Sequence, residues 1–327
     1  MRRRISCPRL VSVNLAGLDA LPALDPLIEA YPFKPYRNYR VLSRKRQDAV
    51  MRAELQAALT QGGGFGLLDD GAAVLVRPQP WDSAFFDLSM ARLYLLHDGD
   101  GSVASLRPLL ASALEACRER GIRHLSVRVD VADAAAIQAF EDAGFRMMDA
   151  LATYIYPLKR PAPEPIKEMG VLRLYRPEDR DQILEITREA YHGFRGRYHL
   201  DAHLPQERSD ALYVEWAKKA CDGEWADVVL VTENGEGVVH GWASYKQIEP
   251  VSTVGEAPIR GGGLGACRRD KPGAYAGLLR AAIERIHGGG AVTEMQTQIF
   301  NFATIRLYES VNTQFVRADY TLHAWLG

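Results

Sequence analysis

The feature that most constrains the fold is an internal repeat. Asp133 and Phe140 are seven residues apart, as are Asn301 and Tyr308, and the second pair follows the first by 168 residues. Each pair marks a helix pattern, and each helix is followed by a strand pattern rich in aromatic residues, TYIYPL in the first copy and YTLHAWL in the second. Two copies of one supersecondary pattern predict tandem domains of similar fold.

Length and composition agree with this organisation. A chain of 327 residues is long for a single core, and 47% hydrophobic with 25% charged residues is ordinary for a soluble globular protein. The net charge of −1 argues against a general nucleic-acid binder and against attraction to a membrane surface. We expect no signal peptide and no membrane span. The cysteines, which show neither metal nor disulfide spacing and fit a reducing cytoplasm, are Cys7, Cys117, Cys221 and Cys267.

The segment KRPAPEPIK, residues 159–167, holds three prolines and is the clearest linker in the chain. We therefore expect an N-terminal helical extension over residues 1–60, a first domain over 61–160, a linker over 161–170 and a second domain over 171–327. The predicted class is α/β with a mixed sheet. Asp70-Gly71 between apolar runs predicts a hairpin, and WDSAFFDLSMARLYLL is interpreted as an alternating strand with aromatic residues in the core.

In the second copy, QTQIFNFATIRLYESVNTQF predicts a strand followed by a helix. Asn301 stands at the expected helix N-cap, and FATIRLYES continues as two to three turns. Asn301 and Tyr308 return to nearly the same helix face because each residue advances the helix by about 100°. The alternative is an ordinary core helix whose Tyr packs its ring and hydrogen-bonds its hydroxyl.

Upstream, the turn RRDKPGAYA opens a long helix pattern and is a candidate anion site, because free helix N–H groups and small residues let a phosphate approach the backbone. Gly273, Ala274 and Ala276 permit the approach, and Arg268, Arg269 and Lys271 supply charge. The alternative is a plain Gly-Pro turn. The preceding strand, GGGLGAC, is dense in glycine, which marks a bulge or a close backbone approach, or alternatively a poorly packed strand.

This order of glycine-rich strand, anion-binding turn, helix, strand, Asn, helix and Tyr resembles the GNAT superfamily of acyl-CoA-dependent N-acyltransferases. The resemblance implies tandem GNAT-like domains, acetyl-CoA as co-substrate and no metal. It also implies direct attack of an amine on the thioester, with Tyr308 protonating the thiolate, whose thiol has a pKa of about 8.5. The cofactor-binding residues that it implies are Leu264, Gly265, Ala266, Cys267, Arg268, Arg269, Lys271, Gly273, Ala274, Tyr275, Ala276, Asn301 and Thr304.

Some residues depart from the superfamily pattern. Asp270 stands where Arg or Gln is usual, Tyr275 replaces the second glycine of the turn, and Gln314-Phe315 stands where Gly-Phe is usual. The first copy has Phe140 in place of Tyr308 and the acidic segment HDGDGSVAS in place of a glycine-rich turn. We therefore interpret the first domain as a degenerate, non-catalytic GNAT-like domain.

The segments WDSAFF, FRGRYH and ALYVEWAKKACDG resemble, within the superfamily, acetyltransferases that modify the 4-amino group of a nucleotide-linked 4-amino-4,6-dideoxygalactose. Arginines in the loop HGFRGRYH would pair with a diphosphate, and nearby aromatic rings would stack on a base or sugar. The alternative is a solvated basic loop beside core aromatic residues. The candidate substrate-binding residues are Arg195, Arg197, Tyr198, Tyr213 and Trp216. The general base stays open among His192, His199, Asp201 and His240.

The sequence thus predicts a cytoplasmic N-acetyltransferase that acts on a small-molecule amine, as a monomer or homodimer, without a nucleic-acid or membrane partner. Two alternatives remain. One is the same reaction on another small amine, such as an aminoglycoside or an amino acid, and the other is a non-catalytic protein that binds acyl-CoA.

Overall fold

The computed structural model describes residues 13–14, 21–69, 71–99, 102–164 and 170–327. The chain forms two compact units. Unit 1 contains the described residues up to Arg37, together with Gln47–Met147 and Thr321–Gly327, and unit 2 contains Asn38–Arg46 and Met148–Tyr320. No helix in the described ranges combines the length and apolar character that a membrane span requires.

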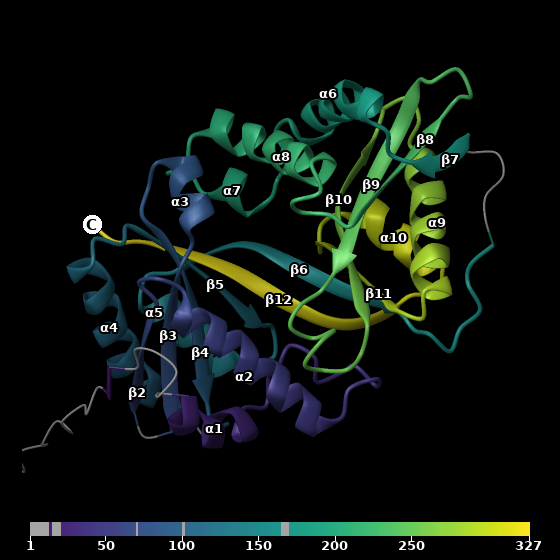
Figure 1. Cartoon of the computed structure of the whole chain (residues 1–327). Coiled ribbons are helices and arrows are strands. Elements are labelled where there is room, and N and C mark those ends of the chain that lie inside the picture. The colour runs from purple at the N-terminus through teal and green to yellow at the C-terminus, as the bar shows by residue number, and fades with distance from the viewer. Residues whose placement is uncertain (1–12, 15–20, 70, 100–101, 165–169) are drawn as a thin grey trace, which may run out of the picture. The chain divides into compact units, whose positions relative to one another are not determined.

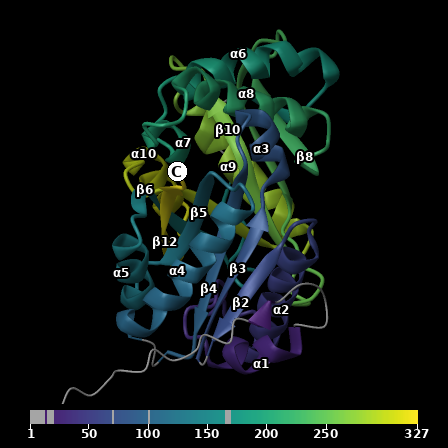
Figure 2. The same cartoon turned by 90° about the vertical axis from the view of Figure 1, so that its left-hand side faces the viewer.

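Unit 1 is built on a mixed sheet with helices on both faces (Figure 2). Its strands, in spatial order, are β1 (Val13–Asn14), β2 (Phe65–Asp69), β3 (Ala72–Pro78), β4 (Met90–His97), β5 (His124–Asp130) and the end of β12 (Gln314–Trp325). Its helices are α1 (Leu21–Ala30), α2 (Arg44–Thr60), α3 (Pro80–Phe86), α4 (Val103–Glu119) and α5 (Ala134–Asp142). Buried side chains of α1 and α2 pack on Ala73, Leu75 and Leu96 of one sheet face.

The strands of unit 2 also pair in a mixed, parallel and antiparallel, arrangement (Figure 1). Its strands, in spatial order, are the beginning of β12, β6 (Arg146–Tyr156), β11 (Val292–Gln298), β10 (Ile259–Cys267), β9 (Val239–Gln247), β8 (Val228–Glu233) and β7 (Val171–Leu174). Its helices are the 3-10 turn η2 (Pro177–Asp179), α6 (Arg180–Tyr191), α7 (Arg197–Leu200), α8 (Gln206–Cys221), α9 (Ala274–Gly288) and α10 (Phe302–Ser310).

The two faces of the unit 2 sheet carry different helices. Helices α6 and α8 pack on the face that presents Trp242 and Ala266. Helix α9 packs on the opposite face, which presents Tyr245, and α10 joins it there against Tyr154 and Met295 (Figure 1). The alternation of side chains along each strand therefore separates an α6/α8 face from an α9/α10 face.

The predicted repeat is present as two capped helices. Asp133 caps α5 by accepting the Ala136 N–H at 3.1 Å, and Asn301 caps α10 by accepting the Thr304 N–H at 3.3 Å. Phe140 and Tyr308, each seven residues after its N-cap residue, are both buried. The fold is therefore α/β with two similar mixed-sheet units, as the sequence predicts.

The division between the units differs from the expected boundaries at 160 and 171. Strand β6 pairs antiparallel with β11 from Thr153 to Tyr156 and beyond, so it belongs to unit 2, while the end of β12 belongs to unit 1. Each unit thus takes a closing strand from the other half of the sequence. Helices α1 and α2 are part of the unit 1 core instead of a separate extension. The linker region is described only up to residue 164 and from 170, and Asp70 of the expected hairpin turn also lies outside the described residues.

The interpretation of WDSAFF as a strand is wrong, because these residues lie in α3. Pro80 begins this helix, and Asp82 lies in its first turn, where a carboxylate favours a helix start. Trp81 and Phe85 stack at 5.3 Å, and of the three aromatic residues only Phe86 is fully buried. A seven-residue helix leaves little periodicity for a sequence pattern to reveal.

The assignment of Gln314-Phe315 to the usual Gly-Phe position is also corrected. Gly144 follows the end of α5 and has φ +87°. The equivalent residue in the second copy of the repeat, 168 positions later, is Asn312, with φ +59°. Asn tolerates this left-handed conformation better than most side chains. Gln314 and Phe315 instead open β12.

Candidate active site

Strands β10 and β11 begin as a parallel pair and then separate. They pair from Ile259 and Val292 to Gly261 and Glu294. Beyond this point β10 continues against β9, and β11 continues against β6. We call the segments Gly262–Cys267 and Met295–Gln298 the splay. Ligands of α/β proteins bind at the carboxyl ends of parallel strands, where such a separation frees backbone groups.

A bulge shapes the β10 side of the splay, as the glycine-rich sequence predicts. The register against β9 shifts between Gly262 and Gly265. Within the bulge the Ser244 hydroxyl accepts the Leu264 N–H at 3.0 Å and donates to the Leu264 carbonyl at 2.9 Å. A Cβ at Gly263 would lie 2.6 Å from the Ser244 hydroxyl, so glycine is required here.

Three tyrosines from three helices meet at the splay. Tyr191, at the end of α6, donates to the Gly265 carbonyl at 2.9 Å. Tyr308, on α10, donates to the Gln296 carbonyl at 3.3 Å and shares a hydrogen bond with the Tyr275 hydroxyl. The Tyr275 ring lies against β10, because a Cβ at Gly265 would be 2.9 Å from a ring carbon. Phenol groups therefore face both strands of the splay.

Burial determines the electrostatics of this group. It raises the pKa of Tyr308 well above the ordinary value, and the neighbouring Tyr275 adds to the effect. Burial also raises the pKa of Tyr191 and Tyr275. All three phenols therefore keep their protons at neutral pH and are available as hydrogen-bond donors.

The N-terminus of α9 has no side-chain cap. Gly273 occupies the N-cap position, and no side chain accepts a hydrogen bond there. One amide of the first turn, that of Tyr275, faces the Cys267 thiol. Burial raises the pKa of this thiol, and the hydrogen bond from the Tyr275 N–H opposes the shift. The thiol also lies 3.9 Å from the Pro272 carbonyl. The Ala274 and Ala276 amides already donate to the Lys271 and Gly273 carbonyls, each at 3.0 Å, so an anion at the turn would gain mainly from the positive end of the helix dipole.

The cations of the turn are engaged with α6. Arg268 donates to the Val239 carbonyl at 2.8 Å and lies 3.6 Å from the Glu185 carboxylate. Arg269 lies 3.3 Å from the Glu189 carboxylate, and Lys271 is exposed. A phosphate at the turn would therefore compete with two carboxylates for the guanidinium groups.

The expected residues at the start of α10 serve its cap. The Asn301 side chain accepts the Thr304 N–H and donates to the Thr297 hydroxyl at 3.1 Å. This cap fixes the first turn of the helix that carries Tyr308. The exposed Phe302 follows directly after the cap.

The predicted acceptor residues lie around α7 and α8. Tyr198 and Tyr213 are buried, and Trp216 packs between them at ring distances of 6.2 and 5.2 Å. Arg197 lies over the Tyr198 ring at 4.3 Å, and Arg195 lies 5.9 Å from the ring of Phe300, at the carboxyl end of β11. Four of these five residues thus form one cluster on the α6/α8 side, and Arg195 reaches toward the start of α10.

The candidate bases have distinct surroundings. Asp210 accepts from the Gly193 N–H and contacts His192 and His199, each at 2.9 Å. Burial alone would raise the pKa of Asp210, but these three contacts hold it below its usual value. Asp201, which is 1% exposed, accepts the His203 N–H at 3.1 Å. His240 is half-buried on β9.

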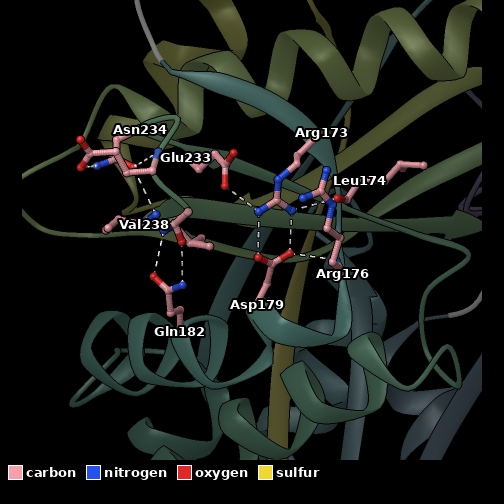
Figure 3. A network of polar contacts seen from close by, with 11 residues as sticks. Arg173, Leu174, Arg176, Asp179, Gln182, Glu233, Asn234 and Val238 are labelled. Atoms are coloured by element: carbon pink, nitrogen blue, oxygen red, sulfur yellow. Dashed lines mark hydrogen bonds and ion pairs between the residues drawn. The ribbon is translucent and has the colours of Figure 1, made fainter.

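An ionic network anchors the start of α6 to the sheet edge (Figure 3). Arg173 pairs with Asp179 through two hydrogen bonds of 2.7 and 2.9 Å and with Glu233 at 2.7 Å. Asp179 is 2% exposed; burial would raise its pKa, but the Arg173 guanidinium and the Arg176 N–H hold it below the usual range. Gln182 adds bonds to the Gly237 carbonyl and the Val239 N–H, both at 2.9 Å. The network positions the helix that ends at Tyr191.

Sequence reasoning missed Tyr191 as a splay residue and missed Asp149, which is discussed below. Tyr191 directly precedes the loop HGFRGRYH, so its place at a helix end adjoining a candidate loop was the available signal. Tyr275 was named for the turn, but its hydrogen bond with Tyr308 depends on how α9 and α10 pack together, which no local pattern shows.

Comparison with known proteins identifies the fold. A scan against models of protein families finds no match. The spore coat polysaccharide biosynthesis protein SpsD of Bacillus subtilis (strain 168) is 24% identical over 151 residues, 46% of this chain and 49% of that protein. The chain therefore matches about half of the length of this relative.

Solved structures match almost the whole chain. A GCN5-related N-acetyltransferase from Sphaerobacter thermophilus has a TM-score of 0.60 at 15% identity and covers 96% of this chain and 95% of that chain. A tandem GNAT protein from the clavulanic acid biosynthesis pathway has a TM-score of 0.55 at 15% identity, covering 96% and 98%. A glucosamine N-acetyltransferase region of a fungal multi-domain β-N-acetylglucosaminidase has a TM-score of 0.58 at 14% identity, covering 96% and 38%. The chain has the tandem GNAT fold.

Proposed function

We propose that the chain is an acetyl-CoA-dependent N-acetyltransferase whose reaction takes place in unit 2. The single observation that carries this proposal is the splay between β10 and β11 with the Tyr308 hydroxyl bonded at its edge. Two similar units are present, and among the described residues only unit 2 combines a bulged strand, a helix N-terminus without a side-chain cap and a phenol at the position of Tyr308.

The proposed mechanism is direct transfer. Acetyl-CoA would bind with its pyrophosphate at the uncapped start of α9 and its pantetheine amides against Leu264–Cys267. The side chains of Tyr191 and Tyr275 contact this strand at Gly265 and would have to move when the cofactor binds. The free amine would attack the thioester carbon and lose one proton to water as the C–S bond breaks, and the Tyr308 hydroxyl would protonate the departing thiolate and regain its proton from solvent.

The proposed acceptor is a small amine, most specifically a nucleotide-linked amino sugar. The sequence resembles dTDP-fucosamine acetyltransferase in the order of its motifs, and one similar protein is named for spore coat polysaccharide biosynthesis. A loop with Arg195 and Arg197 beside aromatic rings has the charge and stacking surfaces that a nucleotide diphosphate sugar requires.

A thiol-release assay tests this function. Purified protein with acetyl-CoA and dTDP-4-amino-4,6-dideoxygalactose should release coenzyme A, and Tyr308→Phe should lower kcat by about 100-fold while leaving acetyl-CoA affinity unchanged. Phe140→Tyr is the matched control in unit 1 and should change neither. Turnover that survives in Tyr308→Phe would remove this residue from the mechanism.

A non-catalytic acyl-CoA-binding protein is the second candidate. It is favoured by Asp270 and Tyr275 in the turn and by the pairing of Arg268 and Arg269 with carboxylates of α6. It predicts acetyl-CoA binding without thiol release on a panel of sugar amines, aminoglycosides and amino acids.

A further inference from the structure

A polar stripe runs along the α6/α8 face of the sheet beside the splay. Glu294, Gln296 and Gln298 alternate on β11, and their side chains share a face because successive residues of a strand point to opposite sides. Gly261, the parallel partner of Glu294, lies on the face that carries Trp242 and Ala266. The stripe therefore lies on the sheet face that carries α6 and α8, opposite the face on which α10 packs, and its Glu294 carboxylate accepts a hydrogen bond from Tyr39.

Strand β6 continues this stripe with a carboxylate. Leu151 is directly opposite Gln298, and Asp149 follows on the same face. The Asp149 Oδ2 lies 3.5 Å from the Gln298 amide nitrogen. Because β6 runs antiparallel to β11, Asp149 is at the carboxyl end of β11, next to the residues that lead into α10.

Asp149 is buried without a full set of partners. The residue is 4% exposed, and its Oδ1 has no hydrogen-bond partner in the part of the chain that the structure describes. A buried carboxylate oxygen without a donor is costly, and native proteins rarely leave one unless a ligand, ion or water completes it. A donor group is therefore missing at this point.

A second buried acceptor atom, on the α7/α8 side of unit 2, lacks a donor among the described residues. The His199 side chain is 4% exposed, and its Nε2 contacts Asp210 at 2.9 Å. Because Nε2 faces this carboxylate, the neutral imidazole carries its hydrogen on Nε2 and presents a lone pair at Nδ1. That Nδ1 is buried and has no partner among the described residues.

Tyr213 lies next to His199, with the two rings stacked at a centroid distance of 5.6 Å. Burial raises the pKa of the Tyr213 hydroxyl, Arg197 opposes the shift, and the negative charge of Asp149 adds to it. Tyr213 also stacks on Tyr191 at 4.4 Å, and Tyr191 bonds Gly265 in the splay.

We propose that the acceptor binds on this α6/α8 face beside Tyr213, donating N–H or O–H groups to Asp149 Oδ1 and His199 Nδ1. The inference rests on the proposed function and specifies its acceptor as an amine rich in hydrogen-bond donors, which binds as the ammonium and loses one proton to water before it attacks the thioester. Two buried acceptor atoms without donors select an alkylammonium bearing hydroxyl groups, which is the chemistry of an amino sugar. The Asp149 carboxylate then compensates the positive charge of the bound ammonium, while the Tyr308 hydroxyl protonates the thiolate from the opposite face of the sheet.

Steady-state kinetics with two matched variants test the site. Asp149→Asn keeps the shape of the side chain and removes its charge, and Asp222→Asn removes an exposed carboxylate that pairs with Arg180 at the surface. The substrates are dTDP-4-amino-4,6-dideoxygalactose, glucosamine and n-butylamine. Asp149→Asn should raise KM for the best amine at least about tenfold and change the Kd of acetyl-CoA less than about twofold. Asp222→Asn should change neither.

His199→Gln is the second variant, because glutamine retains an N–H donor toward Asp210 and lacks the Nδ1 acceptor. It should also raise the amine KM without weakening acetyl-CoA binding, and thermal unfolding verifies that each variant is folded. If the wild type acetylates an amine and both variants keep its KM, the acceptor site is wrong and the proposed function stands.

If the wild type binds acetyl-CoA but acetylates none of the three amines, the acceptor chemistry inferred here is wrong. If it neither binds acetyl-CoA nor releases thiol, the proposed function fails and this inference falls with it.

Discussion

The two units contain the same strand separation and complete it in different ways. In unit 1, β4 and β5 pair in parallel from Met90 and His124 to Leu93 and Val127, and then β4 continues against β3 to His97. This reproduces the separation of β10 and β11 in unit 2. What lies at the carboxyl ends of the strands distinguishes the units.

In unit 1 the chain itself covers these ends. His97 accepts the Gly99 N–H at Nδ1, so its Nε2 donates to the Asp133 carboxylate, at 3.0 and 3.1 Å from the two oxygens. The Tyr31 hydroxyl adds a contact of 3.5 Å to Asp133, and Arg37 pairs with Asp130 at the end of β5. His97 and Asp133 are 2% and 1% exposed, so no ligand is needed to complete them.

The helix that follows each first strand shows the same difference. The Ser102 hydroxyl caps α4 by accepting the Ser105 N–H at 3.3 Å, whereas Gly273 leaves α9 without a side-chain cap. Strands β3 and β4 keep one register along β3, whereas β9 and β10 contain the bulge around Gly263. The comparison teaches that a strand separation is common to both units, and that the bulge and the helix start without a side-chain cap distinguish unit 2, where we propose the cofactor site.

The largest expected effect breaks the cofactor site. Gly273→Glu places a carboxylate at the uncapped start of α9, where it would repel the pyrophosphate of acetyl-CoA. We expect the Kd to rise at least about 100-fold, or about 2.7 kcal/mol. Ser102→Glu makes the matched change at the start of α4 and should leave the Kd within about twofold. Calorimetric titration of both variants decides, and equal losses would show that the two helix ends are not different.

A smaller effect on stability should separate the two caps. Asp133→Ala removes a buried N-cap and leaves His97 and Tyr31 without their acceptor, so we expect a loss of about 2 kcal/mol in the free energy of unfolding. Asn301→Ala removes a half-buried cap and should cost about 1 kcal/mol. Urea unfolding followed by tryptophan fluorescence measures both. A larger cost at Asn301 would reverse the assignment of structural and ligand-binding roles.

The smallest effect sharpens the role of the second phenol. Tyr275→Phe removes the hydrogen bond that Tyr275 shares with Tyr308, and we expect kcat to fall about three- to tenfold. The KM for acetyl-CoA should stay within about twofold. Tyr31→Phe removes a hydroxyl from the covered end of the unit 1 strands and should leave kcat unchanged. If kcat is the same in the wild type and in Tyr275→Phe, the Tyr275 hydroxyl has no role in turnover and the side chain contributes only packing.

The sequence predicts the parts of this comparison that are local. Asp133 and Phe140 have the same spacing as Asn301 and Tyr308, and this spacing identifies the repeat. Phe140 shows that unit 1 has no phenol at the position equivalent to Tyr308. Glycines at 261–265 predict the bulge, because only a residue without a Cβ fits beside Ser244. Each of these signals lies within one strand or one helix.

The remaining features depend on packing between distant segments. The closing strands β6 and β12 contribute to units outside their own halves, and strand pairing leaves no mark on either sequence alone. The cover of unit 1 joins Tyr31 to Asp133 across 102 residues. Asp149, from the first half of the chain, lies 3.5 Å from the Gln298 amide of the second half, so no pattern within one repeat indicates its place.

The stoichiometry of acetyl-CoA binding to the intact chain tests the central claim most directly. Isothermal titration calorimetry should give one acetyl-CoA per chain, because the strand ends of unit 1 are already covered and its helix α4 is already capped. Two sites per chain, or one site that Gly273→Glu leaves intact, would contradict the account and return unit 1 to consideration as a cofactor site.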